Sequence, residues 1–147
     1  MTAPVRIVVA GRPAPKGSWI PVGTHGAMRP DNPRSVPWAD ALAGAAKVAM
    51  IGRAPFVKVP LVLSAVFYLP PDNSQWSMPI GAKTGDLDKI VRNCGDALKR
   101  IVWDDDSRVV MFGGVTKLYA THTPGAVIEV REWAASDAPT VMLKEVG

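Results

Sequence analysis

Five aspartates lie in two short clusters, and their types and spacing point most directly to chemistry. Asp86 and Asp88 stand between Thr84 and Arg92, and a run of three aspartates follows about a helix length later, at Asp104, Asp105 and Asp106. The chain as a whole carries a net charge of +4, so this negative charge is local. Clustered carboxylates need a compensating cation, and oxygen ligands without a nearby histidine favour Mg²⁺ or Mn²⁺ over Zn²⁺. The pattern predicts a divalent-metal site.

Structural roles could also explain each cluster taken alone. An Asp-x-Asp at the start of a helix commonly caps the helix and interacts with its dipole. Three successive aspartates can form a solvated turn. Together, in helix-then-strand order, the two clusters favour metal binding, and such ions in nucleases activate water and stabilise the leaving oxygen of a phosphodiester.

Two cations close to these aspartates have open roles. Arg92 lies four residues after Asp88, so it could contact a phosphate or form an i,i+4 ion pair that contributes only a few tenths of a kcal/mol. Lys16 lies in a loop rich in proline and glycine, where it could bind a phosphate or simply be solvated.

Positive charge is concentrated in the N-terminal part of the chain. Residues 1–53 contain seven Lys and Arg and two Asp, which gives 7 − 2 = +5, so the remaining residues sum to −1. A basic region beside an acidic cluster suits a polyanion held against a metal site. Arg12, Lys16, Arg29 and Arg34 are the candidates to contact the phosphates of such a polyanion, with Lys89 and Lys117 as further candidates.

A helix must present the first acidic cluster. Apolar residues recur from Leu87 to Ile101 with i, i+3, i+4 and i+7 spacing, which predicts an amphipathic helix. Asp86 occupies the expected N-cap position and Asp88 the first turn. Their carboxylates could converge in front of this helix, facing an acid at the start of the next strand.

The remaining elements alternate along the chain. We predict strands at residues 5–10, 57–69, 109–119 and 126–130, with the third interrupted by Gly113-Gly114. A helix is expected from Ser35 to about Met50, and residues 19–36 before it are expected to be irregular. Thr123-Pro124-Gly125 resembles a hairpin turn between the last two strands.

Composition predicts one globular domain. The chain has 147 residues, 48% of them hydrophobic and 20% charged, which is enough to bury a core without disulfides. Its single cysteine, Cys94, cannot form an intrachain disulfide and lies on the apolar helix face, where it should be inert. Trp38 and Trp103 are expected in or at the edge of the core. The longest apolar run is too short to cross a bilayer, so we expect a cytoplasmic protein.

The motifs resemble the signature of the RusA family of Holliday-junction resolvases. The segment from Gly85 to Arg92, then Asp96-Ala97-Leu98, then Trp103 to Val110 carry the main resemblance. The opening segment from Gly11 to Gly17 and Lys117-Leu118-Tyr119 before Pro124-Gly125 are similar to phage and prophage members.

This resemblance implies a small endonuclease of DNA recombination and repair that acts as a homodimer and nicks two opposed strands of a four-way junction with Mg²⁺. By resemblance, Asp86, Asp88 and Asp106 would be the essential metal-binding acids, with Asp105 as an auxiliary. Arg92 stands where the family often has a catalytic lysine. A two-fold dimer suits a two-fold junction, because paired nicks need two equivalent sites.

The sequence therefore predicts an α/β (α+β) domain, RusA-like, with a small mixed β-sheet flanked by about two helices. It would span residues 1–133, followed by a tail at residues 134–147, and act in the cytoplasm of a bacterial host as a phage or prophage product. Two other functions remain open: a non-catalytic protein that binds DNA junctions, and a nuclease that prefers flaps, forks or single strands.

Overall fold

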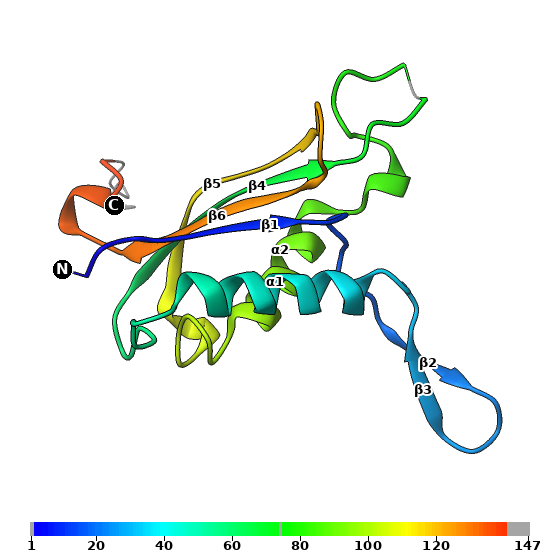
Figure 1. Ribbon diagram of the computed structural model, residues 1–147, viewed down its shortest axis with the longest axis horizontal. Helices are drawn as coiled ribbons and strands as arrows, with labels where there is room; N and C mark the ends of the chain where they lie inside the picture. The colour runs from blue at the N-terminus through cyan, green and yellow to red at the C-terminus, as the bar shows by residue number, and fades with distance from the viewer. Residues whose placement is uncertain (1, 74, 141–147) are drawn as a thin grey trace, which may run out of the picture.

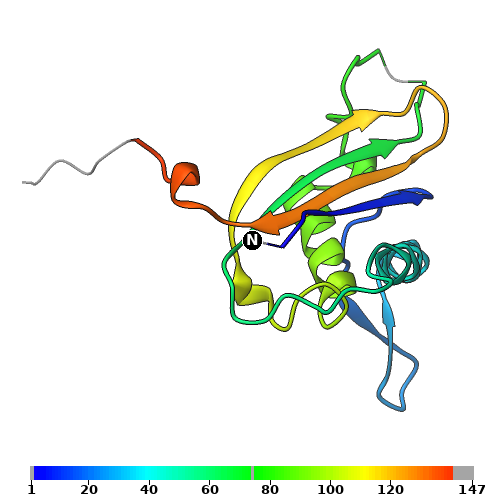
Figure 2. The same ribbon diagram turned by 60° about the vertical axis from the view of Figure 1, so that its left-hand side comes forward.

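A mixed four-stranded sheet with two helices on one face forms the body of the protein (Figures 1 and 2). The computed structural model describes residues 2–73 and 75–140. The sheet order is β1-β6-β4-β5, in which β4 and β5 are parallel and the other neighbours are antiparallel. The strands are β1 (Val5–Ala10), β4 (Leu61–Leu69), β5 (Val109–Tyr119) and β6 (Gly125–Glu132). This confirms the predicted fold class.

Helix α1 (Ser35–Ala49) and helix α2 (Leu87–Leu98) provide the second layer. Alternate residues of the strands point toward these helices, as the period of two in a strand requires. The buried set includes Ile7, Leu63, Phe67 and Ile128 from the sheet, with Trp38, Leu42, Ile90, Cys94 and Leu98 from the helices. Trp38, Trp103 and Cys94 are buried, as expected from the sequence.

Helix α2 is the crossover between two parallel strands. The chain leaves the end of β4, continues through residues 70–85 into α2, and then returns to the start of β5. Such a connection places the helix across one face of the sheet. The predicted apolar face of α2 is buried accordingly, and its polar face, with Asp88, Arg92 and Asp96, is exposed.

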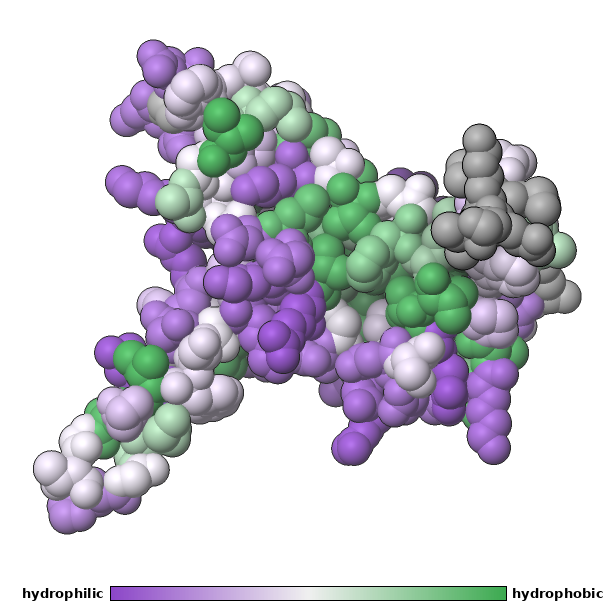
Figure 3. Space-filling view, turned by 180° about the vertical axis from the view of Figure 1, so that it is seen from behind, coloured by the Kyte–Doolittle hydropathy of each residue, from purple (hydrophilic) through white to green (hydrophobic). Residues whose placement is uncertain are grey.

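The segment before α1 is not irregular, which corrects our expectation. β2 (Trp19–Val22) and β3 (Ala27–Pro30) pair antiparallel as a hairpin that projects from the body (Figures 1 and 3). Its turn uses Gly23 and Gly26, both with positive φ. The pattern was missed because the strands are only four residues long and β2 contains Pro21, which is tolerated in a strand at the edge of a sheet.

The predicted hairpin between the last two strands is also wrong. β5 and β6 lie on opposite sides of β4, so the segment containing Pro124 crosses over the end of β4 instead of joining neighbours. The strand β4 is almost wholly buried, which suits a central position. A local turn signal carries no information about which strand is inserted between two others.

Several boundaries and one interruption also differ from the prediction. β6 runs from Gly125 to Glu132 and is longer than the predicted strand at residues 126–130. β4 begins at Leu61 and not at residue 57. The last apolar position assigned to the helix, Ile101, lies beyond its end at Leu98. β5 runs through Gly113-Gly114 with a shift of register against β4. A Cβ at Gly113 would lie 2.6 Å from Ser64 Oγ. The glycine permits close approach of the strands without ending β5.

The tail begins in an ordered turn. Residues 135–137 form a 3-10 turn, and Arg131 of β6 donates two hydrogen bonds, of 2.8 and 2.7 Å, to the carboxylate of Asp137. The predicted tail beyond residue 140 lies outside the described residues. No helix in the described ranges is long and apolar enough to span a membrane.

Candidate active site

The start of α2 is held by contacts from two other segments, the loop that contains Pro15 and strand β5. Gly85 has a φ of +85°, and a Cβ there would lie 3.0 Å from Pro15 Cγ, so a side chain would be doubly unfavourable. Lys117 of β5 donates hydrogen bonds to Gly85 O at 2.7 Å and to Thr84 Oγ1 at 3.0 Å. The backbone leading into the first acidic cluster is therefore anchored to the sheet.

Asp86 and Asp88 both present exposed carboxylates at this end of α2. Asp86 occupies the N-cap position as predicted, and its carbonyl accepts the first helical hydrogen bond from Ile90 N at 3.0 Å. Its carboxylate makes no capping hydrogen bond and lies 3.4 Å from Lys89 Nζ instead. Among the described residues, the Asp88 carboxylate has no hydrogen bond or ion pair, so both groups are accessible to a cation or to water.

Asn93 was overlooked in the sequence and connects three elements. It is buried, and its Nδ2 donates to Ala14 O at 3.1 Å and to Ser35 O at 3.2 Å. Lys16 N also donates to Lys89 O at 3.0 Å. These bonds hold the proline-rich loop of residues 11–18 alongside α2. A polar residue between two apolar helix positions, Ile90 and Cys94, was the available signal.

The three successive aspartates have three different environments. Asp104 accepts two hydrogen bonds of 2.9 Å from Arg108, which lower the pKa of its carboxyl group to about 2. Asp105 accepts a hydrogen bond of 2.9 Å from Ser107 N, which lowers its pKa, and so caps the 3-10 turn at residues 106–108. Asp106 accepts one of 2.9 Å from the buried indole Nε1 of Trp103.

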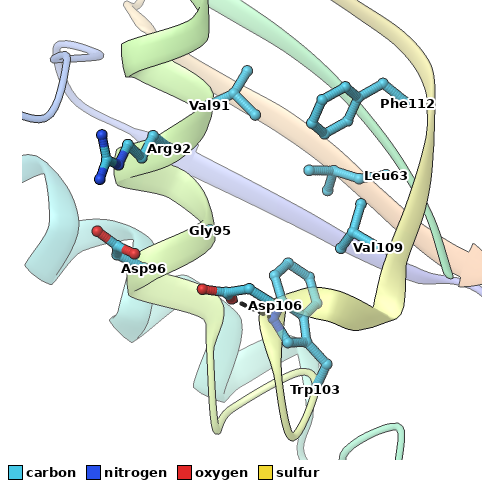
Figure 4. Close-up of a pocket in the computed structure, with 9 residues that line it drawn as sticks. All are labelled: Leu63, Val91, Arg92, Gly95, Asp96, Trp103, Asp106, Val109 and Phe112. Carbon is cyan, nitrogen blue, oxygen red and sulfur yellow. Dashed lines mark hydrogen bonds between the residues drawn. The ribbon is translucent and has the colours of Figure 1, made fainter. Parts of the chain in front are cut away.

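A pocket of about 370 Å³ lies between α2 and the start of β5 (Figure 4). Arg92 and Asp96 project from α2 on the side toward which the Asp106 carboxylate points, and these three form the polar part of the lining. The remaining lining residues are mostly apolar and include Leu63, Val91, Trp103, Val109 and Phe112. Phe112 and its neighbour Val110 are largely exposed, and a hydrophobic area occupies the centre of the face shown in Figure 3.

Arg92 does not form the ion pair that its spacing allowed. No salt bridge joins it to Asp88 within the described residues, although they are four residues apart on one helix face. Asp96 continues this face one turn further and pairs with Lys16. Asp96 belongs to a segment that carries the family resemblance but was not predicted as a site residue; its i+8 spacing from Asp88 could have identified it.

The structure does not bring all the predicted metal ligands together. Asp106 lies beside Gly95 and Asp96, whereas Asp86 and Asp88 lie at the beginning of the helix, roughly 12 Å away along its axis at about 1.5 Å per residue. Within residues 2–73 and 75–140, no three acidic, histidine or cysteine side chains are close enough to hold one ion. The three carboxylates suit a hard cation by type and accessibility, but they do not form a closed ligand cage.

The lysines and the arginines that were predicted to bind DNA have different surroundings. Lys16, Lys89 and Lys117 are engaged with Asp96, with Asp86 and with the backbone of Gly85. Arg12 and Arg34 line common cavities at the N-terminal end of α1. Arg29 lies on β3 of the projecting hairpin.

Comparison with known proteins identifies one family. The profile of the family described as Endodeoxyribonuclease RusA matches residues 10–131, which is most of the chain and includes both acidic clusters. No curated protein was found to match the chain.

Proposed function

Because the chain belongs to the RusA endodeoxyribonuclease family, we propose that it resolves four-way DNA junctions by paired, symmetric nicks that depend on Mg²⁺. The observation that carries this proposal is the polar face of α2. Asp86 and Asp88 present exposed carboxylates at its start, and further along it Arg92 lines the same pocket as Asp106, whose carboxylate points toward Asp96. Negative groups that can hold a cation thus stand beside a cation that can hold a phosphate.

Asp86, Asp88 and Asp106 are the acids that we propose to bind the metal. Because Asp106 lies roughly 12 Å along the helix axis from the other two, one ion shared by all three requires the start of β5 to move toward the start of α2. Each of these acids is exposed and none is neutralised by an arginine among the described residues. Asp105 is the less suitable ligand, because its carboxylate caps the following turn. A bound Mg²⁺, or Mn²⁺ in its place, would activate water and stabilise the leaving oxygen of a phosphodiester.

The residues around the acids would orient the DNA. Arg92 would bind a phosphate through its planar guanidinium, whose N–H groups match the geometry of phosphate oxygens. Trp103 orients Asp106 through its indole N–H. Arg12, Arg29 and Arg34 would contact the DNA backbone, and Lys16, Lys89 and Lys117 would mainly position the loop and helix that carry the site.

Two equivalent sites are needed to cut two strands symmetrically. We therefore propose a homodimer, whose two-fold axis would coincide with that of the junction. The protein would act in the cytoplasm of a bacterial host and would be encoded by a phage or prophage.

The test is cleavage of a labelled four-way junction beside linear duplex and a flap, in Mg²⁺ or EDTA, by the wild type, Asp88→Asn and Asp40→Asn. Asp40 is an exposed acid on α1 away from the site, so its variant is the matched control. Symmetric nicks that require Mg²⁺ and are lost only in Asp88→Asn support the proposal. Asp88→Asn should bind the junction as tightly as the wild type or more tightly, because it removes a charge that repels phosphates. A metal-dependent cut confined to the flap would instead assign a different nuclease preference.

The separation of Asp106 from the first turn of α2 favours one alternative, a protein that binds junctions without cutting them. Tight junction binding with no cleavage in Mg²⁺ or Mn²⁺ would support this alternative and overturn the catalytic assignment.

A further inference from the structure

Three cations surround a small cavity directly before the first acidic cluster. The cavity has a volume of about 130 Å³, and Arg12, Arg34 and Lys83 contribute to its lining. Gly85 lines the same cavity, and Asp86 follows it in the chain. The cavity therefore adjoins the residues proposed to hold the metal.

No acidic side chain neutralises these cations among the described residues. The salt bridges of that part of the chain involve other lysines and arginines. Partial burial, and secondly the positive charge of Arg34, lower the pKa of the Arg12 guanidinium. Both arginines also line a neighbouring cavity of about 250 Å³ against Pro37 and Trp38. An anion bound between these cations would reduce the repulsion among their positive charges.

The backbone around the cavity is held by hydrogen bonds. Arg34 N donates to Asn32 Oδ1 at 3.0 Å, and Ser35 N donates to Asn32 O at 3.2 Å. On the other walls, Asn93 holds Ala14 O and Lys117 holds Gly85 O. A site whose backbone is already ordered loses less conformational entropy when it binds a ligand.

We propose that Arg12, Arg34 and Lys83 together bind one phosphodiester group of the DNA, flanking the group that is cleaved, and so set the position of the strand relative to Asp86. This proposal rests on the proposed function and deepens it. It distinguishes a single shared phosphate site from a diffuse basic surface, and it assigns a role to Lys83. The two arginines provide directed N–H donors that suit phosphate oxygens, and the lysine adds a point charge.

Salt dependence of DNA binding tests the proposal. Affinity for a labelled junction would be measured by fluorescence anisotropy in EDTA over a range of salt concentrations. The slope of log K against log salt changes by about 0.9 for each phosphate that a protein contacts. If the three cations share one phosphate, the triple variant Arg12→Gln/Arg34→Gln/Lys83→Gln should lower the magnitude of the slope by about one unit, and each single variant should lower it by less, because the remaining cations still contact that phosphate.

Lys47→Gln is the matched control. It removes one exposed charge from the last turn of α1, at the opposite end of the helix from Arg34, and should leave the slope unchanged. A decrease of about two units or more in the triple variant would mean that the cations contact separate phosphates. A triple variant indistinguishable from Lys47→Gln would mean that the cavity receives no DNA phosphate. Either result overturns the shared site while leaving junction cleavage by the wild type intact.

If the wild type binds no DNA, the proposed function is wrong, and a second measurement tests the anion site separately. Inorganic phosphate would be titrated into ¹⁵N-labelled protein while the arginine Nε–H signals are followed by NMR. Saturable shifts of the Arg12 and Arg34 signals, weakened in Lys83→Gln, would establish an anion site. Absence of any shift would rule it out.

Discussion

The buried indole of Trp103 donates a hydrogen bond of 2.9 Å from Nε1 to Oδ1 of Asp106. Trp103 is 1% exposed, whereas Asp106 is exposed at the edge of the pocket. A side chain fixed by the core thus orients a carboxylate that faces solvent. This is the arrangement expected of a residue that supports a reactive group from behind.

Trp103→Phe should separate orientation from folding. Phenylalanine keeps an aromatic ring in the core but removes the N–H donor, so kcat should fall roughly tenfold to a hundredfold because Asp106 loses its orientation, while junction affinity stays unchanged. The smaller ring should also lower the free energy of unfolding by about 2 kcal/mol. Single-turnover cleavage, anisotropy and urea denaturation provide the three measurements.

Trp38→Phe is the control for this change. Trp38 is equally buried, and its Nε1 has no hydrogen-bond partner among the described residues. The variant should therefore lose stability but not kcat. Equal losses of kcat in both variants would show that Trp103 acts only through packing.

Asp106→Asn and Asp105→Asn should have different effects. The first removes the charge of the acid that lines the pocket, so we expect cleavage to fall at least a hundredfold with little loss of stability. In the second, the asparagine oxygen can still accept the hydrogen bond from Ser107 N, so the turn and most of the activity should remain. Cleavage rates over a series of Mg²⁺ concentrations would show whether either change weakens metal binding. The reverse result would make Asp105 the principal ligand.

Asn93→Leu should loosen the loop at residues 11–18. Leucine has a similar size but no donor, so Ala14 O and Ser35 O each lose a hydrogen bond, and we expect a loss of about 2 kcal/mol in the free energy of unfolding. Amide hydrogen exchange should rise in this loop first.

Gly44→Ala should have the opposite effect on stability. Gly44 lies within helix α1, and a Cβ added there meets no atom within 4 Å. The substitution should stabilise the protein by about 1 kcal/mol.

Two ion pairs should contribute to stability in a defined pH range. Hydrogen bonds from Arg108 lower the pKa of Asp104 from 3.8 to about 2, and those from Arg131 do the same for Asp137. When folding lowers the pKa of a carboxyl group, the ionised group stabilises the protein at any pH above its pKa in the unfolded state. This stabilisation is lost as the pH falls through the pKa in the folded state. Stability should therefore decrease between about pH 4 and pH 2.

Urea denaturation at several pH values would check this prediction. Asp104→Asn and Asp137→Asn should each reduce the pH dependence in this window, whereas Asp40→Asn should leave it unchanged. Identical pH profiles in all three variants and the wild type would mean that these pairs do not affect acid stability.

The local elements could largely be inferred from the sequence. The helical spacing of apolar residues from Leu87, the Ser35 start of α1 and the β-branched run before Leu69 each depend on neighbours within a few residues. Amphipathic periodicity and turn chemistry are local, so the sequence contains them directly. The two acidic clusters were recognisable for the same reason.

The arrangement of those elements was decided by tertiary structure. The insertion of β6 between β1 and β4, the hairpin at residues 19–30 and the bulge at Gly113 depend on contacts between distant segments. So do the assignment of Asp106 to the pocket and the pairing of Lys16 with Asp96. Residue types determined which chemistry was available, but only packing of the sheet against α2 decided which charges face each other, because side chains far apart in the chain meet only when the core between them forms.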